Sequence, residues 1–301
     1  MSDASNLSST TTSTRTFGIM QGRLSPPEGG RFQSFPRNAW REEFSRAREL
    51  GLDYIEWIHD AYGEGKDATG RVANPIFSEA GLAELDALKR EHLIATPALC
   101  GDWFMDVPFI RCSPPQRIRR EQHLHELIPV AARIGATRIV LPFVDNSKMN
   151  GEYEKQAVLD ILKRALPVSE KNAVELHLET DFGPQDFAAF LRRLEHPMLK
   201  VNWDSGNSSG LGYIATEEFT AYGHRIGSVH INDRFRTPEG EVETRPLGTG
   251  SADFDDVFRA MESMTYKGGF TLQVARGVDG DEVNFIQEQL AFLKPYADRL
   301  S

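Results

Sequence analysis

The stretch AVELHLETDFGPQDFAAFLRRLEHPMLKVNWDSGN, residues 173–207, contains the repeating unit of this chain. It opens with AVELHLET, an apolar run that predicts a buried strand. Apolar residues then recur three or four positions apart in PQDFAAFLRRLEH, which predicts an amphipathic helix. KVNWDS predicts a second strand. A strand, a helix and a strand in this order imply that the two strands pair in parallel.

The same alternation continues along the rest of the chain. Segments of helical period, such as NAWREEFSRARELG and SEAGLAELDALKREH, separate the apolar runs. Eight strands are predicted: TFGIMQ (16–21), LDYIEWI (52–58), LIATPAL (93–99), RIVLPFV (138–144), AVELHLET (173–180), KVNWDS (200–205), GSVHIND (227–233) and GGFTLQV (268–274). Eight strand and helix units in a chain of 301 residues predict an α/β fold, a closed (β/α)8 or TIM barrel.

A doubly wound open sheet also alternates strands with helices. Such a sheet usually opens with a glycine-rich phosphate loop of spacing GxGxxG after its first strand. The stretch GIMQGRLSP, which contains the end of the first strand here, lacks that spacing. The barrel is therefore the favoured fold.

The first 15 residues differ in composition from the rest of the chain. The first 15 residues, MSDASNLSSTTTSTR, are rich in Ser and Thr and offer too little apolar surface to offset the entropy of ordering. We expect residues 1–15 to form a disordered tail and residues 16–301 to form one barrel domain. The whole chain has 40% apolar and 26% charged residues, which is an ordinary globular composition.

Charge and composition also limit the partners and the compartment. A net charge of −10 opposes binding to nucleic acid, whose phosphates attract clustered Lys and Arg. No apolar run approaches the roughly 20 residues that span a bilayer, and the N-terminus lacks the basic and then apolar order of a signal peptide. Cys100 and Cys112 have no scaffold or metal-type spacing, which fits a reducing compartment. We therefore expect a cytoplasmic protein with neither a membrane nor a nucleic-acid partner.

Four polar side chains come late in consecutive predicted strands. Glu179 ends the fifth strand, Asp204 and His230 come late in the sixth and seventh, and Gln273 lies in the eighth. In a TIM barrel the carboxyl ends of the strands converge on one mouth, which holds the active site. Each side chain could instead be satisfied separately, by a backbone carbonyl, a helix cap or an ion pair. Because all four instead come at a similar position along consecutive strands, they predict a site for one divalent metal ion. Mn²⁺ is the first choice, and Mg²⁺, Co²⁺, Zn²⁺ or iron are alternatives.

The sequence also resembles a known superfamily. Seven stretches carry the resemblance: GIMQGRLSP, LCGDWFMD, LPFVDNS, HLETD, DSGNSSGLGY, VHINDR and LGTGSADF. Together they look like the xylose-isomerase-like superfamily of TIM barrels, and within it the branch labelled sugar-phosphate isomerase/epimerase. The resemblance implies metal ligation by Glu179, Asp204 and His230, with a last ligand from the eighth strand. In the ketose 3-epimerases of this superfamily that ligand is a glutamate that also acts as an acid/base group, whereas this chain has Gln273.

Glutamine in the eighth strand changes the expected chemistry. Its oxygen can still bind a cation, but an amide has no usable pKa and cannot shuttle a proton. Glu179 is then the first candidate for the catalytic base, and Glu56, late in the second strand, is the second. Epimerisation also needs a proton donor on the opposite face of the substrate, which could be Glu56, Asp102 or Asp233.

Seven residues from these motifs and from the ends of the strands are expected to contact the substrate: Gln21, Asp102, Trp103, Asn207, Arg234, Arg236 and Arg276. The arginines suit a phosphate, a carboxylate or a developing oxyanion, although ion pairs within loops would explain them equally. The indole ring of Trp103 suits stacking on the C–H face of a sugar, although packing within the barrel would explain this residue as readily. Asn207 stands where related epimerases and endonucleases often carry a histidine.

The predicted function is a divalent-metal-dependent isomerase or epimerase of a carbohydrate or sugar phosphate. It would abstract a proton next to a carbonyl and pass through a metal-stabilised enediolate. A lyase or dehydratase would use the same enolate and then expel a β-substituent, and a non-catalytic sugar-binding barrel would bind without proton exchange. DNA repair is disfavoured, because strands three and four lack the histidines expected of a trinuclear zinc endonuclease. The sugar, its phosphorylation and a homo-oligomeric state stay open.

Overall fold

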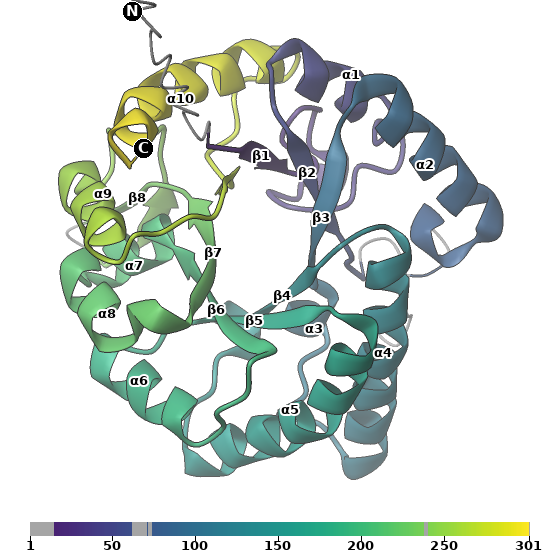
Figure 1. The fold of residues 1–301 in the computed structure, drawn as a ribbon, viewed down its shortest axis with the longest axis vertical. Coiled ribbons are helices and arrows are strands. Elements are labelled where there is room, and N and C mark those ends of the chain that lie inside the picture. Colours follow the sequence, from purple (N-terminus) through teal and green to yellow (C-terminus); the bar gives the residue numbers. More distant parts are fainter. Residues whose placement is uncertain (1–14, 62–70, 72–73, 238–239, 301) are drawn as a thin grey trace, which may run out of the picture.

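Within the residues that the computed structural model describes, 15–61, 71, 74–237 and 240–300, eight parallel strands close into one barrel (Figure 1). The strands are β1 (Phe17–Met20), β2 (Tyr54–Ile58), β3 (Ala95–Cys100), β4 (Arg138–Phe143), β5 (Glu175–Thr180), β6 (Leu199–Asp204), β7 (Ile226–Ile231) and β10 (Phe270–Leu272). Their order around the barrel is β1-β10-β7-β6-β5-β4-β3-β2. The first and last strands therefore pair, with Phe17 opposite Phe270. This topology confirms the predicted TIM barrel.

Each of the eight predicted strands overlaps one barrel strand. The predicted and observed ends differ by at most two residues. The last strand is the shortest relative to its prediction, because β10 ends at Leu272 and leaves Gln273 just beyond it. The alternation of apolar runs and helical segments was therefore a sufficient guide to this architecture.

Helices surround the barrel and connect its strands (Figure 1). They are α1 (Glu42–Glu49), α2 (Glu79–His92), α3 (Trp103–Asp106), α4 (Pro114–Arg133), α5 (Glu152–Asn172), α6 (Pro184–Arg192), α7 (Ser205–Leu211), α8 (Ala215–Tyr222), α9 (Phe254–Ser263) and α10 (Glu282–Ala297). Side chains cap several of their first turns. Ser78 accepts a hydrogen bond from the backbone of α2, Asp204 from that of α7 and Asp253 from that of α9.

Polar and apolar side chains alternate along the strands of the barrel, as the two-residue period of a strand allows. In β7, His230 points into the barrel, where it meets Glu56 of β2, whereas Val229 and Ile231 belong to the apolar core. Thr271 of β10 also reaches across the interior to Glu56. On this side the barrel is filled by polar groups that bond one another, and the apolar core lies between the strands and the helices.

A short hairpin follows β7 and is separate from the barrel. Its strands, β8 (Arg234–Arg236) and β9 (Val242–Thr244), pair antiparallel, with Arg234 opposite Thr244. The hairpin contacts α7, because a Cβ on Gly210 would lie 2.9 Å from Val242 Cγ1 and 3.4 Å from Arg234 Cβ. The sequence reasoning did not predict this element. It places Arg234 at the mouth of the barrel.

Two further predictions concern the N-terminal tail and membrane-spanning segments. The predicted tail, 1–15, lies outside the described residues except for Arg15, which donates a hydrogen bond to the carbonyl of Leu300 at 2.5 Å. Among the described helices, none combines the length and hydropathy that a membrane span requires.

Candidate active site

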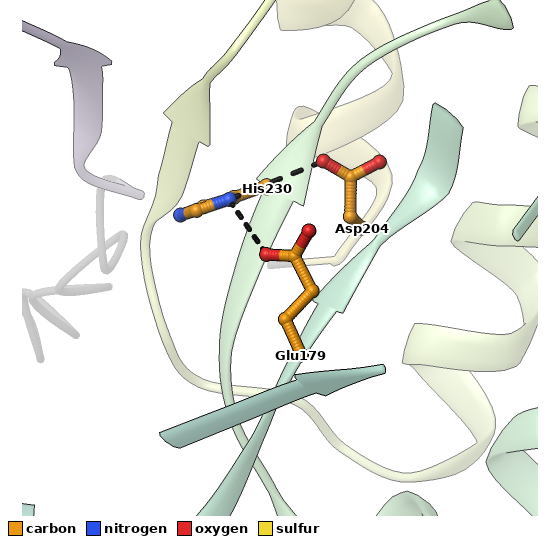
Figure 2. Close-up of side chains that lie close together, drawn as sticks. All are labelled: Glu179, Asp204 and His230. Carbon is orange, nitrogen blue, oxygen red and sulfur yellow. Dashed lines mark ion pairs between the residues drawn. The ribbon is translucent and has the colours of Figure 1, made fainter. Parts of the chain in front are cut away.

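Three buried side chains meet at the mouth of the barrel (Figure 2). Glu179 comes late in β5, Asp204 ends β6, and His230 comes late in β7, directly beside Asp204 in the strand register. His230 Nδ1 lies 3.5 Å from Glu179 Oε2 and 4.0 Å from Asp204 Oδ2. One ligand atom from each residue lies within 4.8 Å of the other two. The structure thus brings together the three residues that the strand ends predicted.

The charges and the unpaired atoms of this triad suit a cation. Asp204 Oδ2 is buried without a hydrogen-bond partner, while Oδ1 accepts from the backbone N–H of Asn207 at 2.6 Å. Burial, together with the neighbouring Glu179 carboxylate, raises the pKa of Asp204 to about 6. Two carboxylates and an imidazole are ligands that divalent cations accept. The triad could therefore hold a divalent metal ion.

Gln273 joins the triad from the position just after β10, the strand that closes the barrel. Its Oε1 lies 3.1 Å from His230 Nδ1, on the side of the ring that faces the carboxylates. Its Nε2 donates to Gln33 Oε1 at 3.0 Å. All four predicted side chains are thus neighbours, and the fourth presents an uncharged oxygen.

Glu56 lies against the other nitrogen of the same ring. Glu56 Oε1 is 3.0 Å from His230 Nε2, and Glu56 Oε2 accepts from Thr271 Oγ1 at 3.0 Å. Burial opposes charge on both groups, but His230 lowers the pKa of Glu56, and Glu56 with Glu179 raises the pKa of His230 well above its usual range. Because Nε2 is directed to Glu56, Nδ1 is turned toward the triad. Metal-binding histidines are commonly oriented by such a carboxylate.

A cavity of about 110 Å³ opens beside the triad. Glu179 and Gln273 line it together with three residues that the sequence predicted to contact substrate, Asp102, Asn207 and Arg234. Arg234 Nε is buried there without a hydrogen-bond partner. Burial raises the pKa of Asp102 to about 6. The cavity therefore combines carboxylates with an unpaired guanidinium donor.

Two asparagines hold the Glu179 carboxylate in place. Asn202 Nδ2 donates to Oε2 at 2.8 Å, and Asn207 Nδ2 donates to Oε1. Asn207 can reach this position because Gly206 lets α7 approach the segment just after β7 closely: a Cβ there would lie 2.6 Å from Asn232 Cγ. The asparagine and the glycine of DSGN thus have separate structural roles.

Three other predicted substrate residues bond the backbone of neighbouring segments. Gln21 Oε1 accepts from a backbone N–H of β2 at 2.9 Å. Arg236 Nε donates to a carbonyl of α7 at 2.7 Å, and Arg276 Nε donates to the carbonyl of Phe32 at 2.6 Å. As far as the described residues go, they do not line the 110 Å³ cavity. Their contact with substrate stays a prediction.

Trp103, the seventh predicted substrate residue, belongs to a buried cluster of rings that the sequence reasoning missed. Its ring centroid lies 4.3 Å from that of His123, and His123 Nε2 lies 2.7 Å from His59 Nε2. His59 comes directly after β2, and this position at a strand end is a sequence signal for a site residue. His123 lies inside α4, where helical periodicity alone does not distinguish it from other core residues.

A larger cavity, about 290 Å³, lies beside α7, α8 and α9. Its lining includes Ser208, Tyr213, Ser251 and Asp253, and does not include the triad. The smaller cavity is the better candidate for a catalytic site, because it contains carboxylates and an unpaired cationic donor beside a possible metal position.

The chain belongs to the xylose isomerase-like TIM barrel family, whose model matches residues 44–296. A protein of Haemophilus influenzae with the name "Putative L-ribulose-5-phosphate 3-epimerase SgbU" is 23% identical over 261 residues, which cover 80% of this chain and 86% of that protein.

Solved structures share the fold. The IOLI protein with a bound zinc atom matches with a TM-score of 0.72 and 15% identity, over 93% of this chain and 99% of that one. D-allulose 3-epimerase from Methylomonas sp., in complex with D-allulose, matches with a TM-score of 0.67 and 17% identity, over 94% of this chain and 97% of that one. The relative from Haemophilus influenzae and the structure from Methylomonas sp. are thus both named as sugar epimerases.

Proposed function

We propose that this chain is a divalent-metal-dependent isomerase or epimerase of a sugar or sugar phosphate, which works by proton abstraction next to a carbonyl through an enediolate. The observation that carries the proposal is the unpaired, buried Oδ2 of Asp204, which faces Glu179 and His230. The names of the relatives support a sugar as the substrate.

The proposed ligands are Glu179, Asp204, His230 and Gln273, with Mn²⁺ as the first choice of metal. When bound there, the cation supplies Lewis-acid polarisation of the carbonyl and hydroxyl oxygens of the sugar, which acidifies the C–H bond between them. Three of these side chains are fixed by neighbours: Glu179 by two asparagines, His230 by Glu56, and Gln273 by Gln33.

Glu179 is the proposed base, and Asp102 is the proposed acid/base group on the opposite face of the substrate. Both carboxylates line the 110 Å³ cavity. Neither alternative to Asp102 is among the described residues that line it: Glu56 is 0% exposed and bonded to His230, and Asp233 accepts backbone N–H bonds from the LGTGSA loop. With its pKa raised to about 6, Asp102 exchanges protons near neutral pH.

Glu56 is then better assigned as the group that orients His230 than as a base. One of its oxygens bonds the ring of His230, and the other accepts from Thr271 in the barrel interior. It is fully buried and is not among the residues that line the cavity. Its removal should therefore weaken the metal site rather than abolish one proton transfer.

The test is solvent exchange measured by proton NMR in D₂O. Protein stripped of metal and reloaded with Mn²⁺ is incubated with a panel of keto-sugars and their 5-phosphates. We expect loss of the proton next to the carbonyl and the appearance of an epimer or an aldose of the same carbon skeleton. A new unsaturated product would support elimination instead, and binding without any exchange would contradict an enzymatic role.

A further inference from the structure

Gln33, which lies between β1 and α1, connects three parts of the barrel mouth through one side chain. Its Oε1 accepts from Arg23 Nη2 at 2.9 Å and from Gln273 Nε2 at 3.0 Å. Its Nε2 donates to Asp102 Oδ2 at 2.7 Å. Gln33 was not singled out by any motif, yet it contacts two residues of the proposed active site.

The two ends of the Gln33 amide have partners of fixed polarity. A guanidinium only donates hydrogen bonds, so the atom of Gln33 that faces Arg23 must be the oxygen. An ionised carboxylate only accepts, so the atom that faces Asp102 must be the nitrogen. A rotation of the Gln33 amide would put two donors together at one end and two acceptors at the other. Its orientation is therefore set by its neighbours.

The orientation of the Gln33 amide also determines that of the Gln273 amide. Because Gln33 presents an oxygen, the atom of Gln273 that faces it must be the nitrogen, and the oxygen of Gln273 then faces His230 Nδ1 at 3.1 Å. A rotated Gln273 would turn its NH₂ group toward His230 Nδ1, on the side of the proposed metal, where the donor hydrogens would repel a cation. A glutamate at position 273 would instead put a carboxylate oxygen against the oxygen of Gln33.

We propose that Gln33 is a positioning residue that holds the Gln273 amide with its oxygen toward the metal position, and that it makes a neutral ligand the favoured one there. The inference rests on the proposed function, because it assigns Gln273 to the same metal site. It explains how this chain keeps an oxygen donor at position 273 without a carboxylate.

The segment that carries Gln33 is itself anchored. Arg23 Nη1 and Arg276 Nε both donate to the carbonyl of Phe32, at 3.0 and 2.6 Å. Arg23 is buried, and its Nε donates to the carbonyl of Val274, next to Gln273. The Arg23 guanidinium therefore bonds both the residue before Gln33 and the residue after Gln273. This keeps the two side-chain amides next to each other.

The experiment measures Mn²⁺ affinity from the electron paramagnetic resonance signal of free Mn²⁺, with the full-length protein at pH 7.5. Gln33→Leu and Gln273→Leu should each lower the affinity about tenfold, as the loss of a supporting or neutral ligand group commonly does. The double variant should bind as Gln273→Leu does, because Gln33 acts through Gln273. If the two losses of Mn²⁺ affinity instead multiply, so that the double variant binds about 100-fold more weakly than the wild type, the proposal is overturned.

Gln156→Leu is the matched control. Gln156, on α5, also bridges an arginine and an aspartate, Arg193 and Asp160, but lies on the exposed outer surface. It should leave Mn²⁺ affinity unchanged. Melting temperatures show that each variant is folded, and Gln33→Met replaces Gln33→Leu if the latter does not fold.

A polarity swap provides the rescue. In Gln33→Glu/Asp102→Asn the new carboxylate still accepts from Arg23 and Gln273, while the new amide at position 102 donates to it. The net charge is unchanged, and Mn²⁺ affinity should stay within about threefold of the wild type, against a tenfold loss in Gln33→Leu. Affinity is the readout, because Asp102 is also a proposed catalytic group.

The outcomes separate the two proposals. If wild-type protein binds Mn²⁺ and both Gln33→Leu and Gln33→Met bind it equally tightly, the role of Gln33 is wrong and the metal site stands. If the wild type binds none, both fail. A polarity swap that binds as weakly as Gln33→Leu would also overturn the role of Gln33.

Discussion

His230 and the pair formed by His59 and His123 are all buried in the barrel, but the groups beside them differ in charge. Around His230 lie Glu56 and Glu179, which raise its pKa well above the usual range in spite of burial. Burial and Arg71 instead lower the pKa of His123 to about 4, and burial with His123 and Arg71 lowers that of His59.

Arg71 determines the direction of the hydrogen bond between His123 and His59. Arg71 Nη2 lies 3.1 Å from His123 Nδ1 and can only donate, so Nδ1 carries the lone pair and His123 Nε2–H donates to His59 Nε2. Both rings are then neutral. Burial alone therefore does not decide the charge of a histidine: neighbouring carboxylates favour the charged form of His230, and a neighbouring guanidinium keeps His59 and His123 neutral.

The largest expected difference between the two regions is in metal affinity. His230→Ala should lower Mn²⁺ affinity by more than about 100-fold, since loss of a direct ligand exceeds the effect typical of an outer partner. His123→Ala should leave the affinity within about twofold. Titration of both variants by isothermal calorimetry makes the comparison. A similar loss in both would show that the two regions are not separate.

A smaller effect is expected from the carboxylates that bond buried histidines. Glu56→Gln should lower Mn²⁺ affinity about 10- to 100-fold, because Glu56 orients the ring of His230. Glu175→Gln is the matched control, since Glu175 Oε2 bonds His177 Nε2 at 2.8 Å in the same way. It should not change the affinity. If both substitutions act equally, ring orientation by Glu56 is not the cause.

The two regions should also differ in their effect on substrate. Arg234, with its unpaired Nε in the cavity, should bind an anionic group, so Arg234→Gln should raise the KM of a sugar phosphate about tenfold, which corresponds to about one charge-assisted hydrogen bond. Trp103→Phe should change KM less than about twofold, because Trp103 packs on His123. A larger effect of Trp103→Phe would place the indole at the substrate.

The smallest expected effect is on the pH dependence of stability. The unfolded chain binds protons on His59 and His123 below pH 6.5, whereas the folded chain resists them until lower pH, so folding becomes less favourable as pH falls through 6.5. From pH 7.5 to 5.5 His123, whose pKa is lowered to about 4, should contribute a loss of about 1 kcal/mol, and His59 a loss in the same direction.

Urea unfolding of the wild type and of His123→Phe at both pH values isolates this contribution from that of other groups. The variant should lose less stability on acidification than the wild type, by about 1 kcal/mol. Identical losses would mean that His123 is not held neutral by Arg71 and burial.

The sequence predicted the triad because its signal is local. Glu179, Asp204 and His230 each come late in a strand, and eight consecutive strands leave little freedom in where their ends meet. The metal and the catalytic roles remain proposals. The fold was predictable for a related reason, since apolar runs and helical periods repeat along the chain.

Contacts made through loops were not predictable in this way. Gln33 reaches Gln273 only because the segment after β1 folds back over the end of β10, and no periodicity records that path. The strands of the hairpin, three residues each, are too short to show an alternation. For Trp103 the sequence allowed two roles, stacking on a sugar and packing inside the protein. The structure shows the packing, because the ring of Trp103 lies against that of His123.

The bonds of Arg23 and Arg276 join the segments that follow the first and last strands, and they also bear on the synthesis of the protein. Arg23 Nε bonds Val274, and Arg276 Nη1 bonds the carbonyl of Ser25, across 251 residues of chain in each case. A nascent chain that ends before Gln273 has neither these bonds nor the last proposed ligand. Contacts of such long range form late in folding, because they must first meet the entropy of closing the intervening loop. The mouth of the barrel is therefore completed only after the ribosome has delivered the last strand.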